Sequence, residues 1–176
     1  MERRKSLDYM IWVDHSISLS IAGKENLKLF QKQMNLKSSE KDRNTMLGLF
    51  NSTNLIYAAS IETMVKAYVL FKELDKIESN KIQNFRQLRK KWSGNGHNIF
   101  DIMKLYDVCF SSEEKDVLIN LEPFMSWAGR FPFPLHDEHI KKYETQEKNL
   151  KLNANKILIA ENFLSRLQKE MNLSIK

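Results

Sequence analysis

Long segments of helical periodicity alternate with short polar breaks along this chain. Between positions 7 and 34 the apolar residues recur every three or four positions, which predicts a helix with one buried face. These residues are Met10, Ile11, Ile17, Leu19, Ile21, Leu27, Leu29 and Phe30. Gly23 is a point where this helix could bend. From positions 54 to 74 apolar side chains occupy nearly every face, which is typical of a helix surrounded by others, so we place the centre of the fold there.

Serine followed three residues later by an acid marks two further helix starts. Ser39 with Asp42 predicts the start of the central helix, which runs to about Leu74. Ser111 with Glu114 forms a capping box for a helix that reaches about position 127, with Pro123 kinking it or ending a first segment.

Shorter helices are expected over 82–92 and 97–110, and a last helix over 154–171. The inner face of that last helix should carry Ile157, Leu158, Ala160, Phe163, Leu164 and Leu167.

Helix-breaking residues are rare, with 5 Gly and 3 Pro among 176 residues. No repeat or linker-like stretch interrupts the chain, so the sequence predicts an all-α, single-domain helical bundle over 1–176. No apolar run approaches a membrane span, which predicts a protein with no membrane association. Cys109 is the single cysteine, so an internal disulfide is excluded and a reducing cytoplasm is the expected compartment. Its apolar neighbours predict burial as a small hydrophobe.

Part of the net charge of +6 is local. Positions 81 to 92 hold basic residues and no acid, and the expected nucleic-acid-binding residues lie there: Arg86, Arg89, Lys90, Lys91 and Trp92. A cluster of like charge raises the local concentration of phosphate. The alternative reading is a solvated helix face.

Two constellations involve titratable side chains. Glu62 and Lys66 lie four positions apart in the most apolar helix, an arrangement that predicts an internal ion pair or a pair lining a ligand site. His97 follows the turn-forming SGNG and precedes Asp101 by one helical turn, so Asp101 could orient the imidazole ring for acid–base chemistry. Alternatively, the histidine is only a polar cap or a packed ring.

A third constellation lies in WAGRFPFPLHDEH, residues 127–139. Arg130 and His136 flank a stiff Phe-Pro-Phe-Pro spacer, and Trp127 could fill the core or stack on a base. No phosphate-binding loop, zinc pattern or serine elbow is present, so neither a metal nor a cofactor is expected.

The combination of YAASIETMVKAYVLF, GHNIFDIMKLY and WAGRFPFP resembles HEPN domains, the higher eukaryote and prokaryote nucleotide-binding helical bundles, in their bacterial form. The resemblance covers about residues 45–172 and leaves 1–37 as an N-terminal helical extension. It places His97 and Asn98 in the Gly-His-Asp/Asn helix start of the family. Arg130 and His136 match the spacing of its R-x4-6-H motif.

The resemblance implies a homodimer that binds RNA or nucleotide within a toxin–antitoxin or phage-defence system, with an antitoxin or nucleotidyltransferase as a further partner. It also implies an alternative, a metal-independent endoribonuclease in which a histidine and an arginine activate a ribose 2′-OH and stabilise the phosphate. The residues would be Arg130 with His136, or His97 with the basic segment. A protein-interaction scaffold with no nucleic-acid role is the third possibility.

Overall fold

The computed structural model describes residues 5–37, 42–92, 96–126 and 154–172, and within these ranges every regular element is a helix. This confirms the all-α prediction. In chain order the helices are α2 (Tyr9–Met34), α3 (Arg43–Lys72), α4 (Leu74–Glu78), α5 (Phe85–Arg89), α6 (Ile99–Leu105), α7 (Ser112–Ser126) and α9 (Ala154–Glu170). None of the described helices combines the length and the apolar character that crossing a membrane requires.

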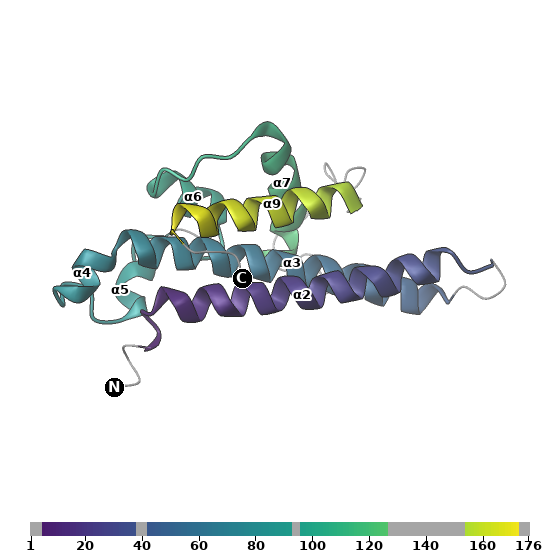
Figure 1. Ribbon diagram of the computed structural model, residues 1–176, viewed down its shortest axis with the longest axis horizontal. Helices are drawn as coiled ribbons and strands as arrows, with labels where there is room; N and C mark the ends of the chain where they lie inside the picture. Colours follow the sequence, from purple (N-terminus) through teal and green to yellow (C-terminus); the bar gives the residue numbers. More distant parts are fainter. Residues whose placement is uncertain (1–4, 38–41, 93–95, 127–153, 173–176) are drawn as a thin grey trace.

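Two long antiparallel helices, α2 and α3, lie side by side along the longest axis of the molecule, and α6, α7 and α9 lie on one side of them (Figure 1). The contact between α2 and α3 is close because small residues meet there. The hydroxyl of Ser16 donates to the Ser60 carbonyl at 2.7 Å, and the hydroxyl of Ser60 donates to the Ser16 carbonyl at 2.8 Å. Both serines are 0% exposed, and each satisfies the other's buried polar groups.

Gly23 is a second point of close approach, and α2 continues through it as one helix. A Cβ atom at this position would lie 2.8 Å from Cε2 of Tyr57, a distance that real contacts do not reach. The glycine is therefore required by the ring of Tyr57, which is fully buried, rather than by a bend in the helix.

The buried face of α2 differs from the face that periodicity predicted. Val13, Ser16 and Gly23 are the buried residues of this helix. Four residues of the predicted apolar set are instead exposed, namely Met10, Ile11, Ile21 and Leu29. Short side chains are selected at the contact because they let the two helix axes approach.

Helix α3 is the centre of the fold, as predicted, since α2, α6, α7 and α9 all pack against it. It begins at Arg43, and Ser39 of the predicted helix start lies outside the described residues. The carboxylate of Asp42 accepts hydrogen bonds from the backbone N–H groups of Asn44 and Thr45 at 3.2 and 3.0 Å, so this residue is itself the N-cap. The helix ends at Lys72, and the separate short α4 follows it.

The capping box predicted at Ser111 is confirmed. The hydroxyl of Ser111 accepts from the Glu114 N–H at 3.1 Å, and Glu114 Oε2 accepts from the Ser111 N–H at 2.8 Å. Helix α7 then continues through the buried Pro123 to Ser126, so the proline does not end a first segment.

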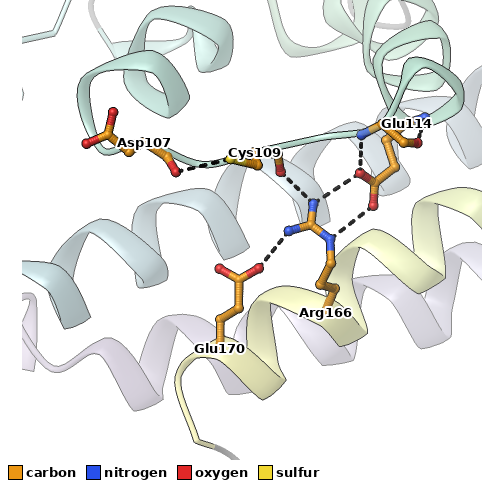
Figure 2. A network of polar contacts seen from close by, with 6 residues as sticks. Asp107, Cys109, Glu114, Arg166 and Glu170 are labelled. Atoms are coloured by element: carbon orange, nitrogen blue, oxygen red, sulfur yellow. Dashed lines mark hydrogen bonds and ion pairs between the residues drawn. The ribbon is translucent and has the colours of Figure 1, made fainter.

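One guanidinium fastens the C-terminal helix to the rest of the bundle (Figure 2). Arg166 of α9 donates to both oxygens of Glu114, at 3.2 and 3.1 Å, to Glu170 at 2.7 Å and to the Cys109 carbonyl at 2.7 Å. The two carboxylates raise the pKa of Arg166 in spite of its partial burial, which acts in the opposite direction. Cys109 is exposed, so the prediction that it is buried is wrong.

The inner face of α9 is close to the predicted one. Ile157, Ala160, Phe163, Leu164 and Leu167 are buried, whereas Leu158 is 53% exposed and lies outside that face.

Candidate functional site

A glutamate, a lysine and a histidine meet at the surface of α3. Glu62 and Lys66 are one helical turn apart, and Lys66 Nζ donates to Glu62 Oε1. Both side chains are nearly buried, at 11% and 12% exposure. Nδ1 of His97 lies 3.0 Å from the same carboxylate oxygen. Glu62 therefore has two partners, one from its own helix and one from the chain that precedes α6.

The backbone at Gly96 brings the histidine to this position. Its φ of 83° lies in the left-handed region, which favours glycine. A Cβ atom there would meet Cε3 of Trp92 at 3.1 Å and Cγ of Arg89 at 3.6 Å. The residue before His97 is thus packed against Trp92 and Arg89 of the basic segment.

The geometry fixes how the imidazole is used. When Glu62 is an ionised carboxylate it only accepts hydrogen bonds, and the His97 ring then donates to it from Nδ1. The proton-accepting nitrogen of the neutral ring is then Nε2. Because the side chain of His97 is 45% exposed, the ring is fixed on one edge by a buried group and remains open to solvent elsewhere. This is the arrangement that an acid–base histidine or a phosphate-binding histidine requires.

The carboxylate at the imidazole is Glu62, in place of the predicted Asp101. Asp101 instead belongs to the cap of α6, where Asn98 Nδ2 donates to its carboxylate at 2.9 Å and Asn98 Oδ1 accepts from its N–H at 3.2 Å. His97 accordingly precedes the N-cap, and the helix begins at Ile99 rather than at 97. Asn98 has a structural role in this cap.

The basic segment forms a short helix, α5, of 5 residues within the predicted range 82–92. The side chains of Arg86, Arg89, Lys90 and Lys91 are exposed. Trp92 is only 7% exposed, and its ring packs edge-on against Phe85 with the centroids 5.4 Å apart. Trp92 is therefore a core residue, and the prediction that it contacts nucleic acid is wrong, because a buried indole presents no face to a base.

A buried carboxylate beneath this segment has no counterpart in the sequence prediction. Glu73 is 5% exposed and accepts from the hydroxyl of Tyr106 at 3.0 Å. Lys76 Nζ lies 2.7 Å and Lys91 Nζ 3.7 Å from its oxygens. Burial alone would raise the pKa of Glu73, but the hydrogen bonds from Lys76 and Tyr106 and the charge of Lys91 outweigh it and hold this pKa below its usual range. Lys91 is therefore already partly neutralised.

The lowered pKa of Glu73 has a consequence for stability at low pH. Folding lowers the pKa of Glu73 below its ordinary value of 4.5. The ionised carboxylate therefore stabilises the folded protein fully at neutral pH, and this stabilisation is lost as the pH falls through the pKa of the folded state. We expect the melting temperature of the wild type to decrease below about pH 5 and that of Glu73→Gln to decrease less. Glu78→Gln, at an exposed position on α4, is the control. Parallel curves for the wild type and Glu73→Gln, measured by circular dichroism, would contradict the role of this carboxylate.

Three predicted site residues, Trp127, Arg130 and His136, lie outside the described residues. Of the remaining predicted groups, the structure brings His97 and Lys66 to the same oxygen of Glu62, and Arg89 lies against Gly96, the residue before His97. Within the described ranges no group of three or more His, Cys, Asp or Glu side chains could hold a metal ion.

Neither a family model, nor a curated protein, nor a solved structure matches this chain. The described residues form an all-α bundle in which His97 contacts the Glu62 carboxylate and the preceding glycine packs against the basic segment.

Proposed function

We propose that this protein is a HEPN-like helical domain that binds RNA or nucleotide through the phosphate groups. The observation that supports this proposal best is the position of the basic segment next to His97. Arg86, Arg89 and Lys90 are exposed, and Arg89 borders the glycine that precedes the carboxylate-oriented histidine. Cations on one short helix increase the local concentration of a polyanion, and an oriented imidazole adds a directional contact to it.

The binding proposal predicts a salt-dependent affinity that this segment controls. Neutralising Arg86, Arg89 and Lys90 together, each by glutamine, should lower the slope of log affinity against log salt by about 2, since each lost contact with a single strand removes about 0.7. At low salt we expect the affinity to decrease by about 10- to 100-fold. The measurement is the fluorescence anisotropy of a labelled mixed-sequence 20-nucleotide RNA titrated with protein between 50 and 300 mM salt.

A matched control removes the same charge elsewhere on the surface. Lys32, Lys115 and Lys169 are exposed residues on α2, α7 and α9, and their triple glutamine variant should retain the wild-type slope. Equal losses in the two triple variants would show that only the net charge matters. An RNA affinity that neither variant changes would favour the protein-interaction scaffold.

The contact between Glu62 and His97 favours a second candidate function, a metal-independent endoribonuclease. In this reaction Nε2 of His97 accepts the proton of a ribose 2′-OH while the 2′-oxygen attacks the adjacent phosphorus to form a 2′,3′-cyclic phosphate, and the 5′-oxygen leaves and takes a proton from water. Glu62 is a positioning residue that holds the ring through Nδ1 at 3.0 Å. The alternative assignment, which the resemblance implies, is Arg130 with His136 in place of His97.

As the family resemblance implies, both candidate functions are proposed for a homodimer that belongs to a toxin–antitoxin or phage-defence system, and the single cysteine favours a cytoplasmic location. An antitoxin or nucleotidyltransferase is its proposed partner.

A further inference from the structure

A groove at the end of the α2–α3 pair lies apart from the candidate site. Its pocket has a volume of about 350 Å³ and is lined by Phe30 of α2 and by Arg43, Met46, Leu47 and Phe50 of α3. The four α3 residues recur every three or four positions, so they form one stripe along the helix. Leu47 is 48% exposed although it belongs to this apolar stripe.

Further toward the C-terminal end of α3, the same stripe packs against α9. Tyr57 is two turns beyond Phe50, and its hydroxyl donates to Glu161 of α9 at 3.0 Å. Helix α9 runs in the direction of α3, and α2 and α3 extend past its first turn (Figure 1). Ala154 precedes Glu161 by the same number of residues as Phe50 precedes Tyr57. Since the two helices run in the same direction, the first residue of α9 lies at about the level of Phe50. The pocket is therefore the continuation of a surface that already accommodates an amphipathic helix.

The charges around the pocket select the kind of helix that fits it. Lys28 is paired with Glu25 at 2.7 Å, and Asp42 is engaged in capping α3. Among the other residues that the structure describes at this end, Lys32, Lys37 and Arg43 are exposed and basic. A second copy docked through the same face would bring like charges together, which disfavours self-association there. An acidic partner would be attracted.

We propose that this groove is a docking site for an amphipathic helix of a partner protein that has an apolar face flanked by acidic residues. In the covered half, Glu161 at the edge of α9 lies 3.5 Å from Lys24 of α2, so α9 already pairs an acid with the basic edge of the groove. The incoming helix would place an apolar side chain in the pocket and a carboxylate near Arg43, which is recognition of a helix in a groove. This inference concerns a different surface from the proposed RNA site and does not depend on it.

The probe is a labelled synthetic peptide with the α9 sequence Ala154–Glu170 and the changes Lys156→Glu, Arg166→Glu and Lys169→Glu. The control peptide has the same apolar residues and the opposite charge, through Glu161→Lys and Glu170→Lys. We expect the acidic peptide to bind the full chain at least about tenfold more tightly at low salt, as measured by fluorescence anisotropy.

Two protein variants test whether the peptide binds in this groove. Leu47→Gln removes the apolar contact and Arg43→Gln removes the charge, and each should lower the affinity for the acidic peptide about tenfold. The matched control is Leu158→Gln on α9, a leucine of similar exposure at 53%, which should bind as the wild type does. Circular dichroism and thermal melting verify that all three variants are folded.

Four results would overturn the proposal. The two peptides could bind equally, or Leu47→Gln could bind as Leu158→Gln does. Sedimentation could show a dimer that Leu47→Gln dissociates, which would assign the groove to a second copy. Finally, Leu47→Gln could lower the melting temperature as strongly as the loss of a fully buried leucine, which would assign the groove to residues 127–153 of the same chain.

Discussion

Replacing Tyr57 with alanine should lower the free energy of unfolding by about 3–5 kcal/mol, the range for truncation of a buried aromatic side chain. Tyr57 is 0% exposed and fills the space between α2, α3 and α9. Tyr57→Phe keeps the ring and removes only the hydrogen bond to Glu161, so its cost should be about 1 kcal/mol. Urea unfolding followed by circular dichroism measures both values. Equal losses for the two variants would show that the hydroxyl, and not the packing of the ring, carries the stability.

Gly23 extends this test to the helix contact itself. In the wild type, Gly23→Ala gains about 1 kcal/mol of helix propensity but forces a methyl group against the ring, at a cost of about 1–3 kcal/mol. The net effect should be a lower free energy of unfolding, because the new Cβ atom would lie 2.8 Å from Cε2 of Tyr57. In the Tyr57→Ala background the obstruction is absent, so the same substitution should stabilise the protein. A cost of Gly23→Ala that is the same in both backgrounds would contradict the packing argument.

The second large effect concerns cleavage. If the protein cleaves RNA in the presence of a chelator, His97→Ala should lower the cleavage rate by about 10²- to 10⁴-fold, the range for loss of a general acid–base group. RNA affinity should change far less, because the phosphate contacts come mainly from α5. His15→Ala, at an exposed position on α2, is the matched control. Full cleavage by both His97→Ala and His136→Ala would remove these residues from the reaction, and an inactive wild type would leave only the binding function.

Variants of Glu62 and Lys66 separate two roles of the Glu62 carboxylate: orienting the His97 ring and stabilising the fold. Glu62→Leu alone should destabilise the fold by about 3 kcal/mol, because the ammonium of Lys66 loses the buried carboxylate that accepts from it. The double variant Glu62→Leu with Lys66→Met replaces the pair by apolar groups and should recover most of that stability. Its cleavage rate should nevertheless stay low, since the His97 ring no longer has an acceptor at Nδ1. Recovery of both quantities in the double variant would show that the carboxylate is not a positioning group.

The fold class and the helix positions could be predicted because they depend on local signals. Ser111 and Glu114 mark a helix start through hydrogen bonds within four residues, and the all-round apolar segment of α3 identifies the centre of the bundle. The buried face of α2 could not be predicted in this way. It is determined by how closely α2 approaches α3, and that distance favours Ser16 and Gly23 over larger apolar residues that hydrophobic periodicity would place inside.

The candidate site shows the same limit. The i, i+4 pairing of Glu62 with Lys66 was visible in the sequence because one helix carries both residues. The contact between Glu62 and His97 joins residues 35 positions apart, so Asp101, nearer in sequence, was the candidate that periodicity offered. Glu73 was missed for a related reason: its partners Tyr106 and Lys91 come from other segments, and only their convergence reveals a buried carboxylate.

The bond between Tyr57 and Glu161 spans 104 positions of the chain. During synthesis the α2–α3 hairpin is complete long before α9 leaves the ribosome, so the face that α9 covers stays open to water until α9 has been made. The nascent protein passes through an interval in which this apolar face of α3 is available to chaperones, and translation of α9 ends that interval.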